Sequence, residues 1–328
     1  YLSPIAPATD YHGYTVEDAG LVSQKLGGEP AWHNLIEEAH SRDMRIIVDT
    51  VLTHTGVNAP WFMDLIHNQQ QSRFQDWYDV KQFPLNPTDP SKPANYRMWS
   101  DGFSHYRNHP VLNLTNPKVR ENRYRVVERW IDRGADGFRF DAPHDATVPQ
   151  DVRFEFWSTL RDRAKAANPE IYLLAELWTY ADADPYLERD IFDGITDYEY
   201  TRAIQEFCVG DNHAINTQRQ TLYRHDYLNA EGLAQAIHTI LSHDGAPNSL
   251  HSIGTHDLPR VATIAEDCTS TVKLLIAMQM SMPGIPCVYY GDEVGMRGGS
   301  DPDNRRPFPW KKQEWDHSIF DCTRSWID

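Results

Sequence analysis

Gly137-Phe138-Arg139-Phe140-Asp141 is the stretch that decides the fold. Apolar and polar residues alternate in it, and a period of two places Arg139 and Asp141 on the same face of a short strand. Because a neighbouring guanidinium favours the charged form of a carboxyl, we expect it to lower the pKa of Asp141. An ionised carboxylate can act as a nucleophile. Taken alone, Asp141 has a second reading as the cap of the next helix.

Three further apolar runs also end in an acid. The run 171–175 ends at Glu176, the run 249–256 ends at Asp257, and the run 44–48 ends at Asp49, five residues before His54. Helix capping or solvation of a strand end would explain any single one of these acids. Catalytic groups of a parallel barrel come from the C-terminal ends of several strands. Four acids at matching positions therefore predict an enzyme of this architecture.

The composition excludes several classes of function. The chain has 31 Lys and Arg against 47 Asp and Glu, which argues against nucleic acid and anionic membrane as partners. No apolar stretch approaches the roughly 20 residues that cross a bilayer. The cysteines are far apart and predict buried thiols rather than a zinc site or disulfide framework: Cys208, Cys268, Cys287 and Cys322. We expect no metal and no cofactor.

Strand and helix signals alternate along the chain, which predicts a parallel sheet with helices outside it. Strands are expected near 1–5, 44–52, 135–141, 171–176, 191–196, 250–255 and 285–290, and helices near 30–42, 116–133, 150–167, 231–242 and 269–281. These are seven strands, whereas a (β/α)8 TIM barrel has eight. We therefore expect a first strand and helix to precede Tyr1.

The expected domain organisation is a barrel with an insertion. Residues 1–54 would supply strands 2 and 3 of the barrel, and residues 113–328 would supply strands 4 to 8 and a C-terminal tail. Between them, residues 55–112 are rich in Asn, Pro, Trp and Tyr and predict a loop-rich inserted subdomain. The tail is too short for a C-terminal β-domain.

Ordered short motifs spanning nearly the whole chain resemble the α-amylase superfamily, glycoside hydrolase family thirteen. The match rests on order and spacing, since each motif alone is weak. The motifs are His12-Gly13-Tyr14, Asp49-Thr50-Val51-Leu52-Thr53-His54, Gly137-Phe138-Arg139-Phe140-Asp141, Ala175-Glu176-Leu177-Trp178, His256-Asp257, and the Met282 to Glu293 segment.

The resemblance implies a catalytic triad of Asp141, Glu176 and Asp257. Asp141 would be the nucleophile that forms a covalent glycosyl-enzyme, and Glu176 would be the general acid and then the base. Asp257 would bind ring hydroxyls and favour the distorted transition state. Retaining enzymes place the first two carboxyls about 5–5.5 Å apart. Since Glu176 must hold a proton, we expect apolar neighbours such as Trp178 to raise its pKa.

The resemblance also implies a set of substrate contacts around the cleaved bond. For the histidines the alternative is a satisfied core residue, for Tyr14 it is plain packing, and for Asp301 and Arg305 it is a surface turn. Asp49 would orient Arg139 rather than contact substrate. The implied substrate-binding residues are Arg139, His54, His256, Tyr14, His12, Trp178, Asp301 and Arg305.

Within the family the chain is most similar to the neopullulanase and cyclomaltodextrinase branch. It departs from that branch in His109-Pro110-Val111-Leu112-Asn113 and in Asp141-Ala142-Pro143-His144-Asp145, which lie towards the acceptor side. At the family's calcium site the usual Asn is Thr53, a poorer ligand for a hard cation, so we do not expect calcium there. A metal at His144 and Asp145 is less favoured than a solvated loop.

The resemblance implies a retaining hydrolase of α-1,4-glucosidic bonds in maltooligosaccharides, starch-type glucans or cyclodextrins. A transglycosylase or isomerase with the same triad is the first alternative, and a non-catalytic sugar-binding member is the second. The partner would be an oligosaccharide or polysaccharide. The sequence leaves the oligomeric state open, and it fits either the cytoplasm or secretion by a bacterium.

Overall fold

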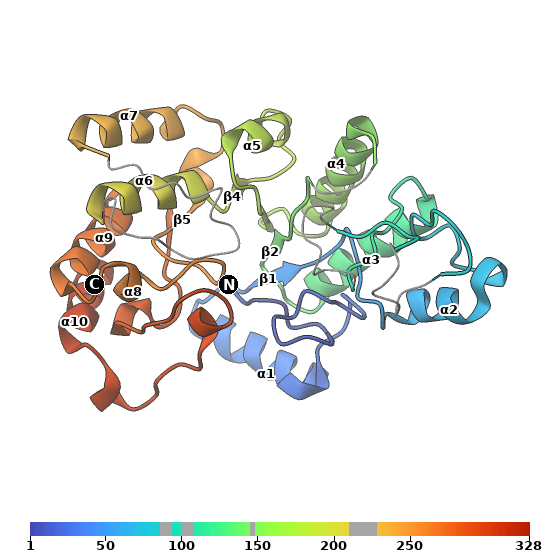
Figure 1. The fold of residues 1–328 in the computed structure, drawn as a ribbon, viewed down its shortest axis with the longest axis horizontal. Coiled ribbons are helices and arrows are strands. Elements are labelled where there is room, and N and C mark those ends of the chain that lie inside the picture. The colour runs from blue at the N-terminus through green and yellow to red at the C-terminus, as the bar shows by residue number, and fades with distance from the viewer. Residues whose placement is uncertain (86–93, 100–107, 145–147, 210–227) are drawn as a thin grey trace. The chain divides into compact units, whose positions relative to one another are not determined.

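The computed structural model describes residues 1–85, 94–99, 108–144, 148–209 and 228–328. Helices and strands alternate along the chain in this structure (Figure 1), as the sequence pattern predicted. The chain divides into two compact units. Unit 1 comprises Tyr1–Glu176 and Arg189–Asp193, and unit 2 comprises Leu177–Glu188 and Gly194–Asp328.

Unit 1 contains parallel strands β1 (Ile47–Thr50), β2 (Gly137–Phe140) and β3 (Tyr172–Ala175). β2 pairs with both neighbours, in a register that aligns Asp49 with Arg139 and Phe140 with Ala175. Leu2 forms a further parallel bridge to Val48 of β1. Because the strands run in one direction, Asp49 near the end of β1 and the acids that follow β2 and β3, Asp141 and Glu176, lie at one edge of the sheet.

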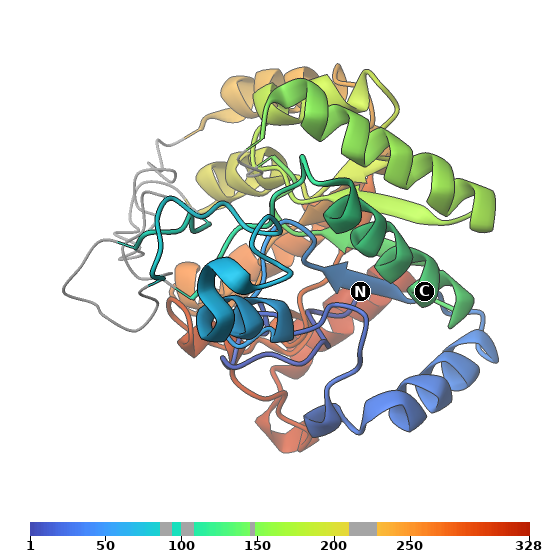
Figure 2. The ribbon, with the colours of Figure 1, turned by 90° about the vertical axis from the view of Figure 1, so that its right-hand side faces the viewer.

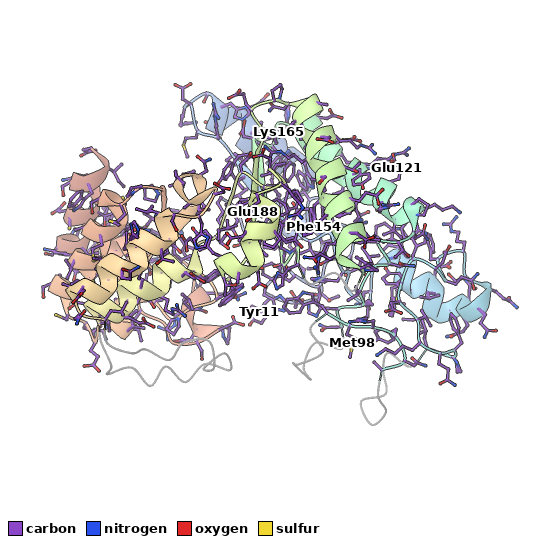
Figure 3. All side chains as sticks on the ribbon, turned by 90° about the horizontal axis from the view of Figure 1, so that it is seen from above. Tyr11, Met98, Glu121, Phe154, Lys165 and Glu188 are labelled. Atoms are coloured by element: carbon purple, nitrogen blue, oxygen red, sulfur yellow. The ribbon has the colours of Figure 1, made fainter. Side chains whose placement is uncertain are left out.

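Helix α3 (Pro117–Asp132) of unit 1 begins where the sequence places its cap. The Asn116 side chain accepts a hydrogen bond from the Lys118 amide, and Pro117 occupies the first turn of α3. α3 lies beside α4 (Gln150–Ala167; Figure 2), and Arg163 of α4 binds Glu121 and Glu128 of α3. Figure 3 labels Glu121 on α3, and Phe154 and Lys165 on α4. The helices are α1 (Gly28–His40), α2 (Pro60–Asn68), α3 (Pro117–Asp132) and α4 (Gln150–Ala167), with 3-10 turns at Gln24–Leu26 and Gln69–Gln71.

The core of unit 1 is aromatic. All four residues of β2 are buried, as expected for a central strand of a parallel sheet. Phe140 packs against Trp157 of α4 and against Phe192, with ring centroids 5.0 and 6.0 Å apart. This packing fixes β2, and with it the face from which Arg139 and Asp141 project.

Unit 2 also has parallel strand pairing. β5 (Leu250–Ser252) pairs with β6 (Ile285–Cys287), and Thr196, next to β4 (Gly194–Ile195), bridges Leu250 in parallel. Its helices are α5 (Tyr180–Leu187), α6 (Tyr198–Cys208), α7 (Ala230–Leu241), α8 (Val261–Ile264), α9 (Thr269–Ser281) and α10 (His317–Ile327). Short 3-10 turns η3 to η6 lie at Ala246–Asn248, Asp292–Val294, Asp303–Arg305 and Lys312–Glu314.

The structure corrects several expectations about secondary structure. The strand expected at 1–5 is reduced to the Leu2 bridge, and α2 lies in the region 55–112 that was read as irregular. Sequence reasoning also missed α5, α6, α8 and α10. In α6 the buried Thr201 and Gln205 donate to backbone carbonyls near β5, so polar residues interrupt its apolar face.

Two further expectations concern the cysteines and the insertion. The cysteines are free, but Cys268 is exposed and the other three are only partly buried, so the prediction of buried thiols is wrong. Residues 86–93 and 100–107 of the expected insertion lie outside the described residues, and its boundaries stay a prediction. Among the described helices, none is both long and apolar enough to cross a membrane.

Candidate active site

Arg139 is the centre of a buried charge cluster in unit 1, which we call the arginine centre: Arg139, Asp49, Asp141 and Glu176. Its Nη1 donates to Asp49 Oδ1 at 3.0 Å and to Asp141 Oδ1 at 2.8 Å. Its Nη2 lies 3.0 Å from Glu176 Oε1. Asp49 is in β1, Asp141 follows β2 and Glu176 follows β3, so the parallel register places all three acids within reach of one guanidinium.

Burial dominates the electrostatics of the arginine centre. Three carboxyls face one guanidinium, and each of these side chains is less than a tenth exposed. Burial raises the pKa of Asp141 to about 6, against the lowering effects of Arg139 and of a hydrogen bond with Glu176. Burial likewise raises the pKa of Asp49. The expectation of a lowered pKa for Asp141 is therefore wrong, because the cost of removing its charge from water exceeds the attraction of Arg139.

Two tyrosines complete the shell of Asp49. The hydroxyls of Tyr1 and Tyr14 both donate to Asp49 Oδ2, at 2.8 and 3.0 Å. The Tyr14 ring lies 5.8 Å from the Arg139 guanidinium carbon. The contact between Asp49 and Arg139 is present, while the role of Asp49 as the residue that orients Arg139 stays a proposal. Sequence reasoning missed Tyr1, which lies in no motif.

Glu176 receives a second contact from the backbone just after Asp141. The Ala142 amide donates to Glu176 Oε2 at 3.0 Å. Ala142 has a φ of +37°, in the region that residues with a side chain rarely adopt. Such strain persists only where the surroundings impose it, and it is concentrated at functional sites. The turn after β2 thus aims an amide at the carboxylate that ends the neighbouring strand.

His54 is buried and neutral. Burial lowers its pKa to about 3. Its Nε2 donates to the Tyr14 carbonyl oxygen at 3.2 Å, and its Nδ1 lies 3.3 Å from the Thr53 hydroxyl. A sugar hydroxyl would therefore share the Nε2 proton with Tyr14, and the implied substrate contact of His54 stays a proposal.

Among the residues that the structure describes, one group of possible metal ligands lies in unit 1. Asp10, His12 and His109 place one ligand-type atom each within 4.8 Å of one another. Both oxygens of Asp10 already accept hydrogen bonds within its loop, Oδ1 from the Gly13 amide and Oδ2 from the Thr15 amide. His12 Nδ1 accepts from the Tyr14 amide at 3.1 Å. We therefore read the group as the organiser of the loop that presents His12 and Tyr14.

Thr53 and His144 are the other positions that the sequence singles out for a possible metal. Thr53 is buried, and its hydroxyl faces His54. Asp145, whose pairing with His144 at a metal was the less favoured reading, lies outside the described residues, and the expected solvated loop stays a prediction.

Asp257 belongs to unit 2, where it lies on a loop after β5. Its Oδ2 accepts from the Tyr198 hydroxyl at 3.0 Å and lies 3.4 Å from His256 Nε2. Its Oδ1 lies 3.6 Å from Arg305 Nη2. Arg305 also contacts Asp301 Oδ1 at 3.0 Å. The structure thus brings His256 and Asp257 together with Asp301 and Arg305, from a second segment that the sequence analysis singled out, and with Tyr198, which it did not.

Trp178 stacks on Tyr198 in unit 2. The ring centroids are 4.0 Å apart and the planes differ by 3°. Since the same Tyr198 donates to Asp257, this stack links the expected sugar-binding Trp178 to the third acid of the implied triad. The predicted effect of Trp178 on Glu176 stays a prediction.

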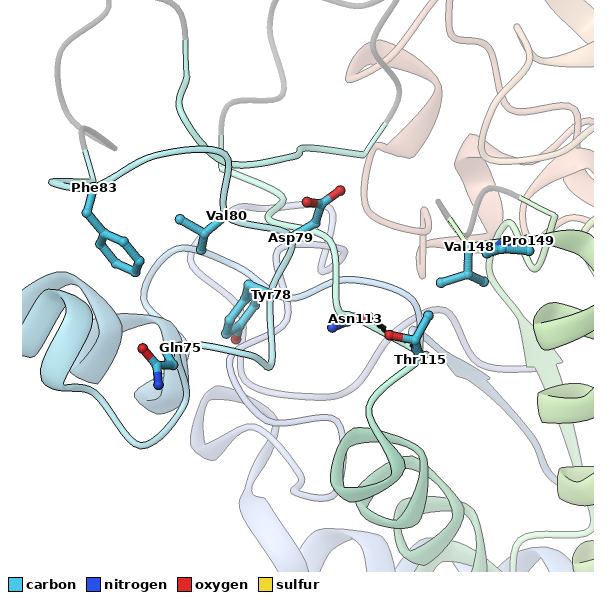
Figure 4. Close-up of a pocket in the computed structure, with 9 residues that line it drawn as sticks. All are labelled: Gln75, Tyr78, Asp79, Val80, Phe83, Asn113, Thr115, Val148 and Pro149. Carbon is cyan, nitrogen blue, oxygen red and sulfur yellow. Dashed lines mark hydrogen bonds between the residues drawn. The ribbon is translucent and has the colours of Figure 1, made fainter.

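A pocket of about 460 Å³ lies elsewhere in unit 1 (Figure 4). No residue of the arginine centre lines this pocket. Asn113 comes from one of the two segments that depart from the neopullulanase pattern, and Val148 follows shortly after the other. Its lining residues are Gln75, Tyr78, Asp79, Val80, Phe83, Asn113, Thr115, Val148 and Pro149.

Comparison with known proteins decides the family. Residues 1–328 match the family Alpha-amylase, described as alpha amylase, catalytic domain. The chain belongs to the alpha-amylase family. Members of this family of α-glycosidases have a (β/α)8 barrel as their catalytic domain, so the predicted fold class is confirmed. The predicted strand and helix before Tyr1 stay a prediction.

The similar proteins support the predicted branch of the family. The chain is 30% identical to neopullulanase 2 of Thermoactinomyces vulgaris over 328 residues, which cover 100% of the chain and 52% of that protein. It is also 30% identical to a cyclomaltodextrinase of Bacillus sp over 321 residues, covering 98% of the chain and 53% of that protein. The neopullulanase and cyclomaltodextrinase branch is therefore confirmed. The chain spans about half the length of these relatives.

Solved structures agree with this result. The debranching enzyme from Nostoc punctiforme has a TM-score of 0.90 and 33% identity, with 99% of this chain and 65% of that chain covered. A cyclic α-maltosyl-(1→6)-maltose hydrolase from Arthrobacter globiformis has a TM-score of 0.87 and 29% identity, with 99% and 68% covered.

Proposed function

We propose that this chain is the catalytic part of a retaining glycoside hydrolase that cleaves α-1,4-glucosidic bonds. Its substrates would be maltooligosaccharides, starch-type glucans or cyclodextrins. Two kinds of support converge on this proposal. The similar proteins include a neopullulanase and a cyclomaltodextrinase, and the arginine centre holds paired carboxyls of the kind that glycosidases use.

The observation that carries the mechanism is the shared contact of Asp141 and Glu176 with Arg139. Retaining glycosidases need one ionised carboxylate as nucleophile and one carboxylic acid as proton donor, held close together. Asp141 and Glu176 come from the ends of adjacent strands, which lie roughly 4.8 Å apart in any sheet. One guanidinium among three buried carboxyls leaves an excess of negative charge if all are ionised. A proton in this group is therefore favoured near neutral pH.

In the proposed reaction, Asp141 attacks the anomeric carbon while Glu176 donates a proton to the leaving glycosidic oxygen. The bond from the anomeric carbon to that oxygen breaks, and a bond to the Asp141 carboxylate forms. Glu176, now ionised, then takes a proton from water, whose oxygen displaces Asp141 and regenerates both groups. Arg139 stays charged throughout and keeps the attacking carboxylate in place. Asp257 would bind ring hydroxyls of the distorted sugar.

Transfer to a sugar hydroxyl instead of water is the alternative outcome of the same intermediate. In either case the same side chains would contact the sugars: Tyr14, His12, His54, His256, Trp178, Asp301 and Arg305.

The test is a product profile of the whole enzyme on soluble starch, β-cyclodextrin, pullulan and maltotriose, with Asp141→Asn as control. We expect cleavage that is lost in the control. Larger sugars from maltotriose would indicate transfer. A folded wild-type enzyme that turns over none of the four substrates would refute the proposal.

A further inference from the structure

Asn304 is a fully buried residue of the turn η5 (Asp303–Arg305) in unit 2. Its Nδ2 donates to the carbonyl oxygens of His256 at 2.7 Å and of Leu258 at 2.9 Å. These two carbonyls belong to the residues on either side of Asp257. The Asn304 amide group therefore spans the peptide segment that carries the Asp257 carboxylate.

A second layer of buried contacts fixes Asn304 itself. Arg260 Nε donates to the backbone carbonyl oxygen of Asn304 at 2.8 Å, and Arg260 Nη1 donates to Asp292 Oδ1 at 3.1 Å. The Arg260 guanidinium lies over the Tyr289 ring, 4.1 Å from its centroid. Arg260 and Asp292 are both about 1% exposed. The backbone of Asn304 is thus held by a buried ion pair of unit 2.

The Asp257 segment has little regular structure of its own to hold it. β5 ends at Ser252 and α8 begins at Val261, so residues 253–260 lie in neither a strand nor a helix. Within the segment, the Asp257 amide donates to the Thr255 hydroxyl and the Leu258 amide to the Thr255 carbonyl. The Asn304 side chain adds contacts from a part of the chain more than 40 residues away.

We propose that Asn304 is the positioning residue for Asp257, a role that rests on the proposed function of Asp257 in binding the distorted sugar. Two carbonyl acceptors require two N–H donors on one side chain, which an amide supplies and a carboxylate does not. Asn304→Asp would have nearly the same shape, but a carboxylate oxygen, which has no proton to donate, would take the place of Nδ2 beside both carbonyls. Asn304→Leu would remove the amide donor from both carbonyls, and the His256 carbonyl would keep its hydrogen bond from Arg305 Nε at 2.9 Å.

The test measures kcat and KM on a maltooligosaccharide for both Asn304 variants of the whole enzyme, alone and combined with Asp257→Asn. Misplacement of a catalytic group by about 1 Å costs on the order of 100-fold in rate. We expect a loss of that size in kcat with little change in KM. Because Asn304 acts through Asp257, the loss should vanish in the Asp257→Asn background.

Asn116→Leu is the matched control. Asn116 is also a buried asparagine with two side-chain hydrogen bonds, to the Asp76 carbonyl and from the Lys118 amide, but it caps α3 in unit 1. We expect it to lower stability and leave kcat close to that of the wild type. If Asn304→Leu does not fold, the isosteric Asn304→Asp carries the test.

Two results would overturn the inference: a wild-type kcat in the folded Asn304 variants, or the same fold-loss in the Asp257→Asn background. Amide hydrogen exchange distinguishes failure of the positioning role of Asn304 from failure of the proposed function. If the wild type cleaves no glucan, faster amide exchange of residues 255–260 in the Asn304 variants than in Asn116→Leu still supports the positioning role. Unchanged exchange there would overturn it.

Discussion

Asp141→Asn should make the protein more stable at neutral pH while removing its activity. Burial raises the pKa of Asp141 to about 6 from its ordinary value of 3.8, so the folded state keeps this proton to a higher pH than the unfolded chain does. As the pH rises from about 4 to about 6, the unfolded state loses the proton first, and the free energy of unfolding falls. An asparagine has no such dependence.

The size of the effect follows from the two pKa values. The interval from 3.8 to about 6 corresponds to about 3 kcal/mol at pH values above 6. This figure already includes the attraction to Arg139, because the pKa of about 6 is the net result of burial and that attraction. Asn retains an oxygen that can accept the hydrogen bond from Arg139 Nη1, so the substitution removes charge with little change in shape.

The assay is urea unfolding of wild type and Asp141→Asn at pH 4 and pH 7.5. We expect the variant to exceed the wild type by up to about 3 kcal/mol at pH 7.5 and by much less at pH 4. Asp162→Asn, at an exposed position of α4, is the control and should show no such pH-dependent gain. A variant no more stable than wild type at pH 7.5, or a gain equal at both pH values, would refute the reasoning.

Three further predictions concern the same sheet and its acids. The kcat/KM of the wild type should rise with pH through about 6 as Asp141 ionises. Glu176→Gln should lose the basic limb of the pH–rate profile, with a fall in kcat of at least about 100-fold. A retained basic limb would exclude Glu176 as the acid. Arg139→Lys, whose ammonium cannot reproduce the planar fork, should lower the free energy of unfolding by about 3 kcal/mol in urea, and unchanged stability would contradict this. Gly137→Ala would place a Cβ 2.8 Å from the Tyr172 carbonyl oxygen and should cost about 1–3 kcal/mol by the same measurement, whereas a neutral effect would mean that β2 and β3 separate easily.

The sequence predicted the parts of the site that depend on strand period and direction. Alternation in β2 places Arg139 and Asp141 on one face, and parallel pairing brings Glu176 to the same edge, where Arg139 contacts both. The predicted direction of the shift in the pKa of Asp141 was wrong, because the sequence shows the neighbouring charge but not the complete burial of Asp141 and Arg139.

Contacts made by residues outside the motifs were not predictable from pattern. The donation from Tyr1 to Asp49 depends on how the first residues lie along β1, and no local signal reports that position. Asn304 belongs to a segment for which the sequence allowed a surface turn as an equally good interpretation. It is nevertheless fully buried, because the turn folds against the Asp257 loop. Helix α6 was missed because its buried face carries Thr201 and Gln205, whose polar groups bind carbonyls near β5.

The most direct test of the account is the anomeric form of the first product. Proton NMR of the whole enzyme acting on a maltooligosaccharide, recorded before mutarotation, distinguishes the two stereochemical outcomes. A covalent intermediate on Asp141 predicts that the α-anomer appears first and that Asp141→Asn releases none. Initial release of the β-anomer, or undiminished cleavage by Asp141→Asn, would contradict the proposed mechanism.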